Sequence, residues 1–328
     1  MKAIQYSGGN ESIALLEIDV PIPGDGECLI QLKASALNRR DQWIREGLYP
    51  GIKPGVTLGS DGAGIVIKGP SQWMNKEVIV NPNQSWGPND RAQRTDYTIL
   101  GMPHHGTLSE FITVPVDRLA EKPGHLNWEQ AAGLPLAGMT AYRALFYRGR
   151  LKPENRVLVT GIGGGVSQFA LQFALSHGCK VFVTSGNQDK IDRACDLGAA
   201  KGFNYHDDDW ANQLSSQGKV DLVIDSAAGA SLNEYLSIVN PGGKIVIYGG
   251  TTGKTPDFDI RKLFWQQIDV LGSTMASDDQ FLEMVDFVNK NQITPTIDRV
   301  FTTSNYLEAF DRFKAHDHLG KIVITWEP

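Results

Sequence analysis

Short apolar segments that alternate with longer, helix-like stretches are the feature that most limits how this 328-residue chain can fold. From about residue 124 onward these segments read RVLVT, KVFVT, VDLVID, KIVIYG and IDVLGS, and a helix with a cap candidate at Asn127 and Gln130 precedes them. Each connection is long enough to hold a helix, as parallel neighbours require, whereas antiparallel strands can be joined by tight turns. The pattern predicts an α/β fold built on a doubly wound parallel sheet.

Residues 1–123 follow a different pattern. Short strands with alternating apolar residues, such as ECLIQLKASAL, are interrupted by turns such as PIPGDG and NPNQSWGPN, which is typical of a small β-barrel or sandwich. After the parallel sheet, SDDQFLEMVDFVNKN and NYLEAFDRFKA predict helices, and IDRVF and KIVIT predict strands. Periodicity leaves open whether this last segment extends the sheet or returns to the first domain.

Composition limits the partners and the compartment. The net charge of −6 provides no broad basic surface for nucleic acid or anionic lipid. The sequence has no run of about 18 apolar residues, the length that spans a bilayer, and its N-terminus has no signal-like apolar core. Cys28, Cys179 and Cys195 form no CxxC pair, which argues against a disulfide framework. We therefore expect a cytoplasmic protein without a nucleic-acid or membrane partner.

Residues 155–168, NRVLVTGIGGGVSQ, place a strand directly before a run of glycines and a helix. Glycines let the backbone approach a pyrophosphate, and the helix start offers unpaired N–H groups and a positive dipole end. The candidates for this contact are Gly161, Gly164, Gly165 and Val166. Taken alone, the motif also fits a tight turn without a ligand or a domain for another nucleotide.

Several spaced motifs are more specific than the glycine run: ALNRRDQWIREGLYPG, LGSDGAGIV, GTLSEFITVP, AAGLPLAGMTAYRAL, VLVTGIGGGVSQFALQFA and the closing GKIVI. Together they resemble the medium-chain dehydrogenase/reductases, and within them the zinc-independent quinone oxidoreductase-like branch. The resemblance implies a GroES-like β-barrel catalytic domain, residues 1–123 joined by residues 276–328, and a Rossmann domain at residues 124–275, with the active site in the cleft. It also implies a homodimer with the strand around IDVLGS as the seam.

The zinc-dependent relatives in this family bind the metal through a cysteine, the histidine of a GHE motif and a third residue. The corresponding positions here hold Asn38, Ser60 and Leu136. Asparagine, serine and leucine cannot form a tetrahedral zinc site, which requires thiolate, imidazole or carboxylate ligands. The resemblance and this ligand chemistry together predict a protein without a bound metal.

The second strand of the predicted sheet ends without the acidic residue that usually binds the NAD ribose. Ser185 and Gly186 stand in its place, and Lys190 follows. A 2′-phosphate carries nearly two negative charges and needs donors and a cation, so these residues favour NADP(H). The resemblance assigns the phosphate contact to Ser185 and Lys190. Asp189 beside Lys190 opposes this assignment, and Lys190 with Arg193 also suits a solvated helix surface.

By position in the family, the resemblance implies further cofactor contacts. Packing or helix capping explains each of them equally well, because serine and threonine often cap helices at strand ends. These candidates are Tyr205, Ser226 and Gly249 on the nucleotide, and Thr140, Ser273 and Thr274 near the nicotinamide.

Without a metal, the charge that hydride transfer leaves on the acceptor must be spread by the acceptor or held by hydrogen bonds. A quinone or an α,β-unsaturated carbonyl spreads it, so we expect NADPH-dependent reduction of such acceptors. The catalytic candidates are Asn38 as donor, Asp41 and Ser60, although Asn38 also suits a turn cap and Asp41 a structural pair with Arg39 or Arg40. Two alternatives stay open: a metal-free alcohol or aldehyde dehydrogenase, and a module that binds NADPH without turnover.

Overall fold

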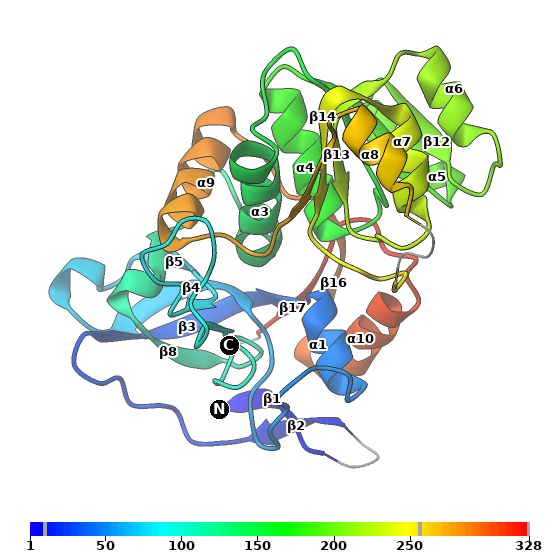
Figure 1. The fold of residues 1–328 in the computed structure, drawn as a ribbon. Coiled ribbons are helices and arrows are strands. Elements are labelled where there is room, and N and C mark those ends of the chain that lie inside the picture. The colour runs from blue at the N-terminus through cyan, green and yellow to red at the C-terminus, as the bar shows by residue number, and fades with distance from the viewer. Residues whose placement is uncertain (9–11, 255–257, 327–328) are drawn as a thin grey trace. The chain divides into compact units, whose positions relative to one another are not determined.

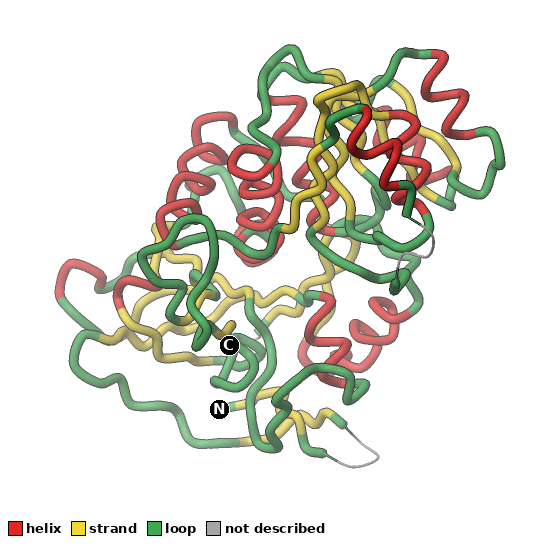
Figure 2. The backbone as a smooth tube through the Cα atoms, in the orientation of Figure 1, coloured by secondary structure: helices red, strands yellow, loops and turns green. Residues whose placement is uncertain are grey.

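The computed structural model describes residues 1–8, 12–254 and 258–326. The chain forms two compact units. We call Gly138–Ala276 the continuous unit, and Met1–Ala137 with Ser277–Pro328 the discontinuous unit. Figure 1 labels many of the elements of both units, and Figure 2 colours the same backbone by secondary structure.

Among the described residues, the continuous unit contains a six-stranded sheet in which every neighbouring pair is parallel. The spatial order is β12-β11-β10-β13-β14-β15, so the chain runs from β10 to one edge and then from β13 to the other. This is the order of a doubly wound sheet, which confirms the predicted fold class. The strands are β10 Arg156–Val159, β11 Lys180–Ser185, β12 Lys201–Asn204, β13 Val220–Asp225, β14 Val239–Ile247 and β15 Asp269–Gly272.

Apolar side chains cover both faces of this sheet. Val157, Leu158 and Val159 on β10 are all fully buried, although successive residues of a strand point to opposite faces. Leu158 packs in one cluster with Phe182 and Trp210. The near-continuous apolar strands of the sequence are therefore those of a parallel sheet that is buried on both sides.

The helix expected after Asn127 is divided. Its capping box with Gln130 is present, but α2 ends at Gly133, and α3 begins at Pro135 and passes into a π-helical turn, η3. Proline lacks the N–H that would bond to the preceding turn, so Pro135 suits the first position of a new helix. No helix of the described residues is long and apolar enough to cross a bilayer. The helices between residues 128 and 265 are α2 Trp128–Gly133, α3 Pro135–Tyr142, η3 Arg143–Arg148, α4 Gly165–Ser176, α5 Gln188–Asp196, α6 Trp210–Ser216, α7 Ser231–Ile238 and α8 Ile260–Trp265.

Within its described residues, the discontinuous unit is built on a seven-stranded sheet with the order β16-β17-β3-β4-β5-β9, and β8 also pairs with β3. The last strand, β17, lies antiparallel to β3, so the C-terminal segment returns to this unit. Ile30, Leu58, Phe310 and Ile322, from both parts of the chain, share one core. The strands are β1 Lys2–Tyr6, β2 Ile13–Glu17, β3 Glu27–Ala36, β4 Asp61–Lys68, β5 Glu77–Val80, β6 Asn83–Gln84, β7 Thr98–Ile99, β8 Phe111–Pro115, β9 Leu119–Glu121, β16 Ile297–Thr302 and β17 Lys321–Thr325. The remaining helices are α1 Arg39–Arg45, η1 Ser71–Trp73, η2 Val116–Arg118, α9 Asp278–Asn291, η4 Thr303–Asn305 and α10 Tyr306–Lys314.

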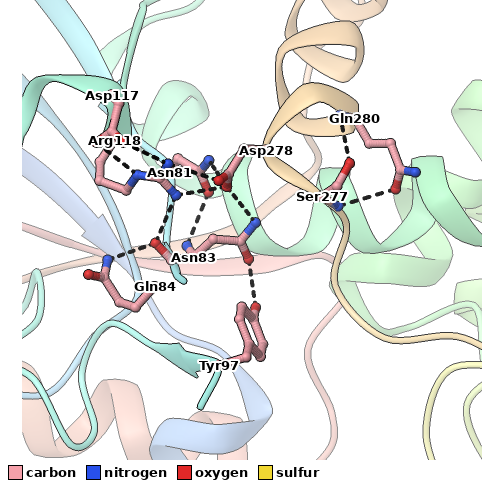
Figure 3. A network of polar contacts seen from close by, with 9 residues as sticks. All are labelled: Asn81, Asn83, Gln84, Tyr97, Asp117, Arg118, Ser277, Asp278 and Gln280. Carbon is pink, nitrogen blue, oxygen red and sulfur yellow. Dashed lines mark hydrogen bonds and ion pairs between the residues drawn. The ribbon is translucent and has the colours of Figure 1, made fainter. Parts of the chain in front are cut away.

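A polar network holds the first residue of α9, Asp278, within the discontinuous unit (Figure 3). The Arg118 guanidinium donates to both Asp278 carboxylate oxygens, at 2.7 and 2.8 Å, and the side-chain amides of Asn81 and Asn83 each donate at 3.0 Å. Tyr97 Oη donates to Asn83 Oδ1 at 2.6 Å. Desolvation raises the pKa of Asp278, but the hydrogen bonds from Arg118 and the amides, with the charge of Arg118, outweigh it and lower that pKa. The charged form of Asp278 is therefore the one that the fold favours.

Candidate functional site

Most of the predicted cofactor residues lie at the carboxyl ends of the strands of the parallel sheet. All six strands end on this side because neighbouring strands run in the same direction. Ligands of doubly wound sheets bind outside the carboxyl ends of the strands. The candidates follow β10 (Gly161, Gly164, Gly165 and Val166), end or follow β11 (Ser185, Gly186 and Lys190), and follow β12 (Tyr205), β13 (Ser226), β14 (Gly249) and β15 (Ser273 and Thr274).

The glycine run forms the turn between β10 and α4. Gly161 has a φ of 59°, a left-handed conformation that favours glycine, and α4 begins at Gly165 after Gly164 at the N-cap. The Ser167 hydroxyl lies 2.8 Å from the carbonyl oxygens of both Gly161 and Gly164, so a small polar residue holds this turn together. The first N–H groups of a helix have no partner within it, and this turn therefore fits a pyrophosphate.

A buried carboxylate holds the ends of β10 and β13, where the strand order reverses. Asp225, the last residue of β13, is fully buried and accepts hydrogen bonds from Thr160 Oγ1 at 2.6 Å and from the Tyr235 hydroxyl at 2.9 Å. Burial, reinforced by the charge of Asp225, raises the pKa of Tyr235, so its hydroxyl remains a donor. Sequence reasoning missed this cluster because hydrogen bonding across strands leaves no local signal.

The end of β11 gathers hydroxyl and amide groups. Ser185 Oγ, on a buried residue, accepts a hydrogen bond from the Asn187 N–H at 3.1 Å. Asn187 is the N-cap of α5, and its side chain accepts from the Lys190 N–H at 3.2 Å. The Tyr205 N–H donates to the Ser185 carbonyl oxygen at 3.2 Å. The structure thus brings Ser185, Lys190 and Tyr205 to one strand end.

Ser226 and Gly249 meet where β13 and β14 end. A Cβ on Gly249 would lie 2.8 Å from the Ser226 carbonyl oxygen, so this close approach requires glycine. At the end of β15, the Ser273 N–H donates to the Ile247 carbonyl oxygen. The buried Oγ of Ser273 has no hydrogen-bond partner among the described residues. A buried hydroxyl in that state is a group that a bound ligand can satisfy.

Thr140 lies beside the segment that follows β15. It is 5% exposed, and its Oγ1 donates to Met275 Sδ at 3.9 Å, whereas Thr274, which precedes Met275, is exposed.

The glycine turn, the close strand ends and the buried hydroxyl of Ser273 together fit a dinucleotide bound along the carboxyl ends of the strands.

In the discontinuous unit, Asn38 belongs to a buried polar triad with Asp61 and Lys321. Lys321 Nζ donates to Asp61 Oδ2 at 2.9 Å and to Asn38 Oδ1 at 2.7 Å, and Asn38 Nδ2 donates to Asp61 Oδ2 at 2.9 Å. The Lys321 and Asp61 side chains are 4% and 0% exposed. Since an ammonium only donates and a carboxylate only accepts, they fix the orientation of the Asn38 amide. Sequence reasoning missed Lys321, although it lies in the closing GKIVI motif.

Asp41 is fully buried and bonds to backbone groups. Its Oδ2 accepts from the Asn38 N–H at 2.8 Å and its Oδ1 from the Gly59 N–H at 3.2 Å. Burial raises the pKa of Asp41, and the charge of Arg40 opposes this effect. The carboxylate ties the start of α1 to the segment before β4. This position favours the structural alternative for Asp41, with backbone N–H groups as its partners.

Ser60 is also fully buried, and its hydroxyl is used within the unit. It accepts from Arg40 Nη1 at 2.7 Å and donates to the Leu100 carbonyl oxygen at 2.8 Å. The Arg40 guanidinium also donates to the Leu100 and Met102 carbonyl oxygens and lies over the Tyr49 ring. Arg40 and Ser60 therefore bind the segment around Leu100 to α1.

The residues at the family's zinc positions do not fit a zinc ion. Asn38 and Ser60 offer an amide and a hydroxyl that are already hydrogen-bonded, and Leu136 offers an aliphatic side chain. The ammonium of Lys321 places a positive charge 2.7 Å from the Asn38 oxygen, which further opposes a divalent cation. Within the described part of the chain, no group of three or more His, Cys, Asp or Glu side chains is arranged to hold a metal ion.

Comparison with known proteins identifies the family behind this arrangement. Residues 24–124 match the family described as alcohol dehydrogenase GroES-like domain, and residues 165–290 match the family described as zinc-binding dehydrogenase. The zinc-type alcohol dehydrogenase-like protein YogA of Leptosphaeria maculans is 36% identical over 334 residues, which cover 94% of this chain and 92% of that protein. The chain belongs to the medium-chain dehydrogenase/reductase superfamily.

Other members of the superfamily carry different functional names. The quinone oxidoreductase of Pongo abelii is 29% identical over 280 residues, which cover 82% of this chain and 78% of that protein. A crystal structure of an NAD-dependent alcohol dehydrogenase has a TM-score of 0.92 and 32% identity, and the match covers 100% of both chains. These matches confirm the GroES-like and Rossmann fold class and place this medium-chain dehydrogenase/reductase among oxidoreductases. The substrates given in the names of these relatives differ: alcohols in two of them and a quinone in the third.

Proposed function

We propose that this medium-chain dehydrogenase/reductase reduces a quinone or an α,β-unsaturated carbonyl with NADPH and without zinc. The observation that carries the proposal is the buried Asn38–Asp61–Lys321 triad, in which a hydrogen-bonded amide stands where zinc-dependent relatives have a metal ligand. A conjugated acceptor spreads the charge that it receives, so hydrogen-bond donors suffice to stabilise it. Bound NADPH would supply the hydride, and the chain's own residues would orient the acceptor.

Asn38 is the donor that we assign to the acceptor oxygen. Its Nδ2 carries two hydrogens, and Asp61 accepts one of them. Lys321 holds the amide oxygen, so the second N–H has a fixed direction and needs no reorganisation when charge develops. Asn38 is 7% exposed, so water competes weakly for this group.

NADPH is proposed over NADH because of the side chains at the end of β11. Ser185 and Gly186 occupy the position at which an NAD site has an acid, and Lys190 and Tyr205 flank the same strand end. A hydroxyl, a phenol and an ammonium suit a 2′-phosphate, whereas an acid would repel it. Nucleotide preference depends on these few groups rather than on the shared fold, so similarity to an NAD-dependent structure does not decide it.

Binding and turnover test this proposal together. NADPH and NADH would be titrated against the protein, and NADPH consumption would then be screened with quinones, enones and aldehydes. Replacing Lys190 by glutamate is expected to weaken NADPH binding at least tenfold and to leave NADH binding nearly unchanged. Lys180→Glu, at the opposite end of β11, is the matched control. An unchanged preference for NADPH in Lys190→Glu would contradict the phosphate assignment.

Two other functions remain as alternatives. Similarity to alcohol dehydrogenase-like proteins favours a metal-free alcohol or aldehyde dehydrogenase, which would show NADP⁺-dependent oxidation of alcohols in the same screen. A module that binds NADPH without catalysis would show tight binding and no consumption with any acceptor class.

We also propose a homodimer that forms through β15. This strand is an edge of the parallel sheet, and Val270 on it is 37% exposed. The preceding helix α8 exposes Phe264 and Trp265, at 62% and 81%. An exposed edge strand beside large apolar side chains is a surface that a second copy can cover. Sedimentation showing only monomer at micromolar concentration would refute this assembly.

A further inference from the structure

The space beside Gly186, after the end of β11, is filled by the side chains of two residues that follow β12, Tyr205 and His206. A Cβ added to Gly186 would lie 2.6 Å from His206 Nε2 and 2.8 Å from the Tyr205 hydroxyl. The volume in which an acidic side chain would start in an NAD site is thus taken by an imidazole and a phenol. His206 was not among the residues that the sequence singled out.

We propose that His206 is a further determinant of nucleotide preference, and that its Nε2 binds the 2′-phosphate in the protonated state. This inference rests on the proposed use of NADPH and extends it to one additional residue. Its consequence is a preference for NADPH over NADH that increases as the solution becomes more acidic.

Local contacts hold the imidazole beside Gly186. The Tyr205 and His206 rings lie 4.7 Å apart, centroid to centroid, at an interplanar angle of 66°. The Tyr205 N–H donates to the Ser185 carbonyl oxygen at 3.2 Å, and the His206 N–H donates to Asn204 Oδ1 at 3.0 Å. The backbone of both residues is therefore fixed to the ends of β11 and β12, and their side chains are exposed.

The charged groups near this position explain why protonation matters. α5 contributes Lys190 and Asp189 in its first turn, and Tyr205 adds a neutral hydroxyl. Three carboxylates, Asp207, Asp208 and Asp209, follow His206 directly in the sequence. Asp189 adjoins Lys190 in the first turn of α5, and a second cation beside Lys190 would offset that negative charge toward a bound phosphate.

Imidazole chemistry supplies that cation. Neutral imidazole has one donor nitrogen and one acceptor nitrogen, whereas imidazolium donates from both and carries a positive charge. A 2′-phosphate offers only acceptor oxygens when it is fully ionised. Binding of the phosphate and protonation of the ring hence favour each other, and histidine is the side chain suited to this coupling between pH 5 and 8.

Calorimetric titration at pH 6.5 and pH 8.5 tests the inference on the full chain. The ligands are NADPH, NADH, adenosine 2′,5′-bisphosphate and AMP, so a binding fragment reports the phosphate contact independently of turnover. For His206→Asn we expect about tenfold weaker binding of NADPH and the bisphosphate at pH 6.5 and about twofold weaker binding at pH 8.5. NADH and AMP should bind as they do to the unmodified protein.

The controls separate this residue from the general assignment. Because the 2′-phosphate itself gains a proton near pH 6, variants are compared with the unmodified protein at the same pH. His177→Asn, at the C-terminal end of α4, is the matched control, and His206→Gln is a second variant that guards against local misfolding. Circular dichroism confirms that each variant is folded.

Two results overturn the inference in distinguishable ways. If the unmodified protein binds NADPH no more tightly than NADH, the nucleotide assignment itself is wrong, and the role of His206 is lost with it. If NADPH is preferred but both His206 variants keep that preference at both pH values, only the role of His206 is wrong. A loss confined to the 2′-phosphate ligands and larger at pH 6.5 supports it.

Discussion

The polar triad of the discontinuous unit and the strand-end cluster of the continuous unit, which is Ser185, Asn187, Lys190 and Tyr205 at the end of β11, both consist of polar or charged residues but differ in burial. Asn38, Asp61 and Lys321 are buried and hydrogen-bond to one another. In the cluster at the end of β11, Tyr205 is half-exposed, and the hydrogen bonds that hold the segment are mainly those of the backbone.

This difference predicts two kinds of effect when these residues are replaced. A buried ion pair has already lost its water, so removing one partner leaves a charge without compensation and the fold loses stability. Exposed side chains that are held in place only through their backbone can be replaced with little loss of stability. The effect of replacing them is then on ligand affinity. We therefore expect substitutions in the triad to lower stability and substitutions at the end of β11 to lower NADPH affinity.

Breaking the triad should have the largest effect. Lys321→Met leaves the Asp61 carboxylate buried without its ammonium partner, and we expect about 3 to 5 kcal/mol less free energy of unfolding in urea. Lys76→Met removes the exposed pair with Glu121 and should cost less than about 1 kcal/mol. Equal losses in the two variants would mean that the triad is no more important than a surface pair.

Placing an acid at the strand end should change nucleotide choice and leave stability nearly intact. In Gly186→Asp the new side chain displaces the Tyr205 and His206 tips and adds a negative charge, so NADPH affinity should fall by about a hundredfold relative to NADH. Gly186→Asn has nearly the same volume without the charge and separates the two causes. Fluorescence titration provides the affinities. An Asp variant that keeps its preference for NADPH would refute the assignment.

The Asp278 network should show an intermediate cost that depends on pH. Asp278→Asn weakens the hydrogen bonds from Arg118, and we expect a loss of about 1.5 kcal/mol at pH 7. The lowered pKa of Asp278 means that the stability it adds is present above the ordinary aspartate pKa, about 3.9, and is lost as pH falls through the lower folded value. Urea unfolding at pH 7 and pH 3 should therefore show a smaller difference at pH 3. Asp117→Asn, with a 70% exposed side chain, should change little at either pH.

The smallest effect is expected for a helix cap at the strand-end cluster. Asn187→Ala removes the hydrogen bond to the Lys190 N–H and should cost about 1 kcal/mol of unfolding free energy. Since this cap also places the first turn of α5, NADPH affinity should fall more than NADH affinity. Asn212→Ala, on an exposed face of α6, is the control. A loss shared equally by both nucleotides would mean that the cap does not position the phosphate site.

The sequence was sufficient where periodicity and spacing carry the information. The strands β10, β11, β13 and β15, the glycine turn and both C-terminal helices lie where the pattern predicts them. β12 was missed because KGFN is short and has one large apolar side chain, which gives no alternation. The predicted fold class followed from these elements.

The candidate sites were predictable only in part. Asn38, Ser60 and the residues after β11 could be chosen by position in the family, but their surroundings could not. Lys321 lies 260 positions from Asp61, and such a pairing leaves no local trace in the sequence. His206 escaped notice for the same reason, since its relation to Gly186 exists only once two parallel strands are aligned.

The return of β17 to β3 also dictates an order of events on the ribosome. Residues 138–276 are contiguous and can complete their sheet while the rest of the chain is still being made, whereas the sheet around β3 has a missing neighbour until the final residues emerge. Before then Asp61 lacks the ammonium of Lys321, so the carboxamide of Asn38, our proposed donor, acquires its fixed orientation last. A nascent chain that stops before residue 321 would thus carry the whole parallel sheet and a triad that lacks its ammonium.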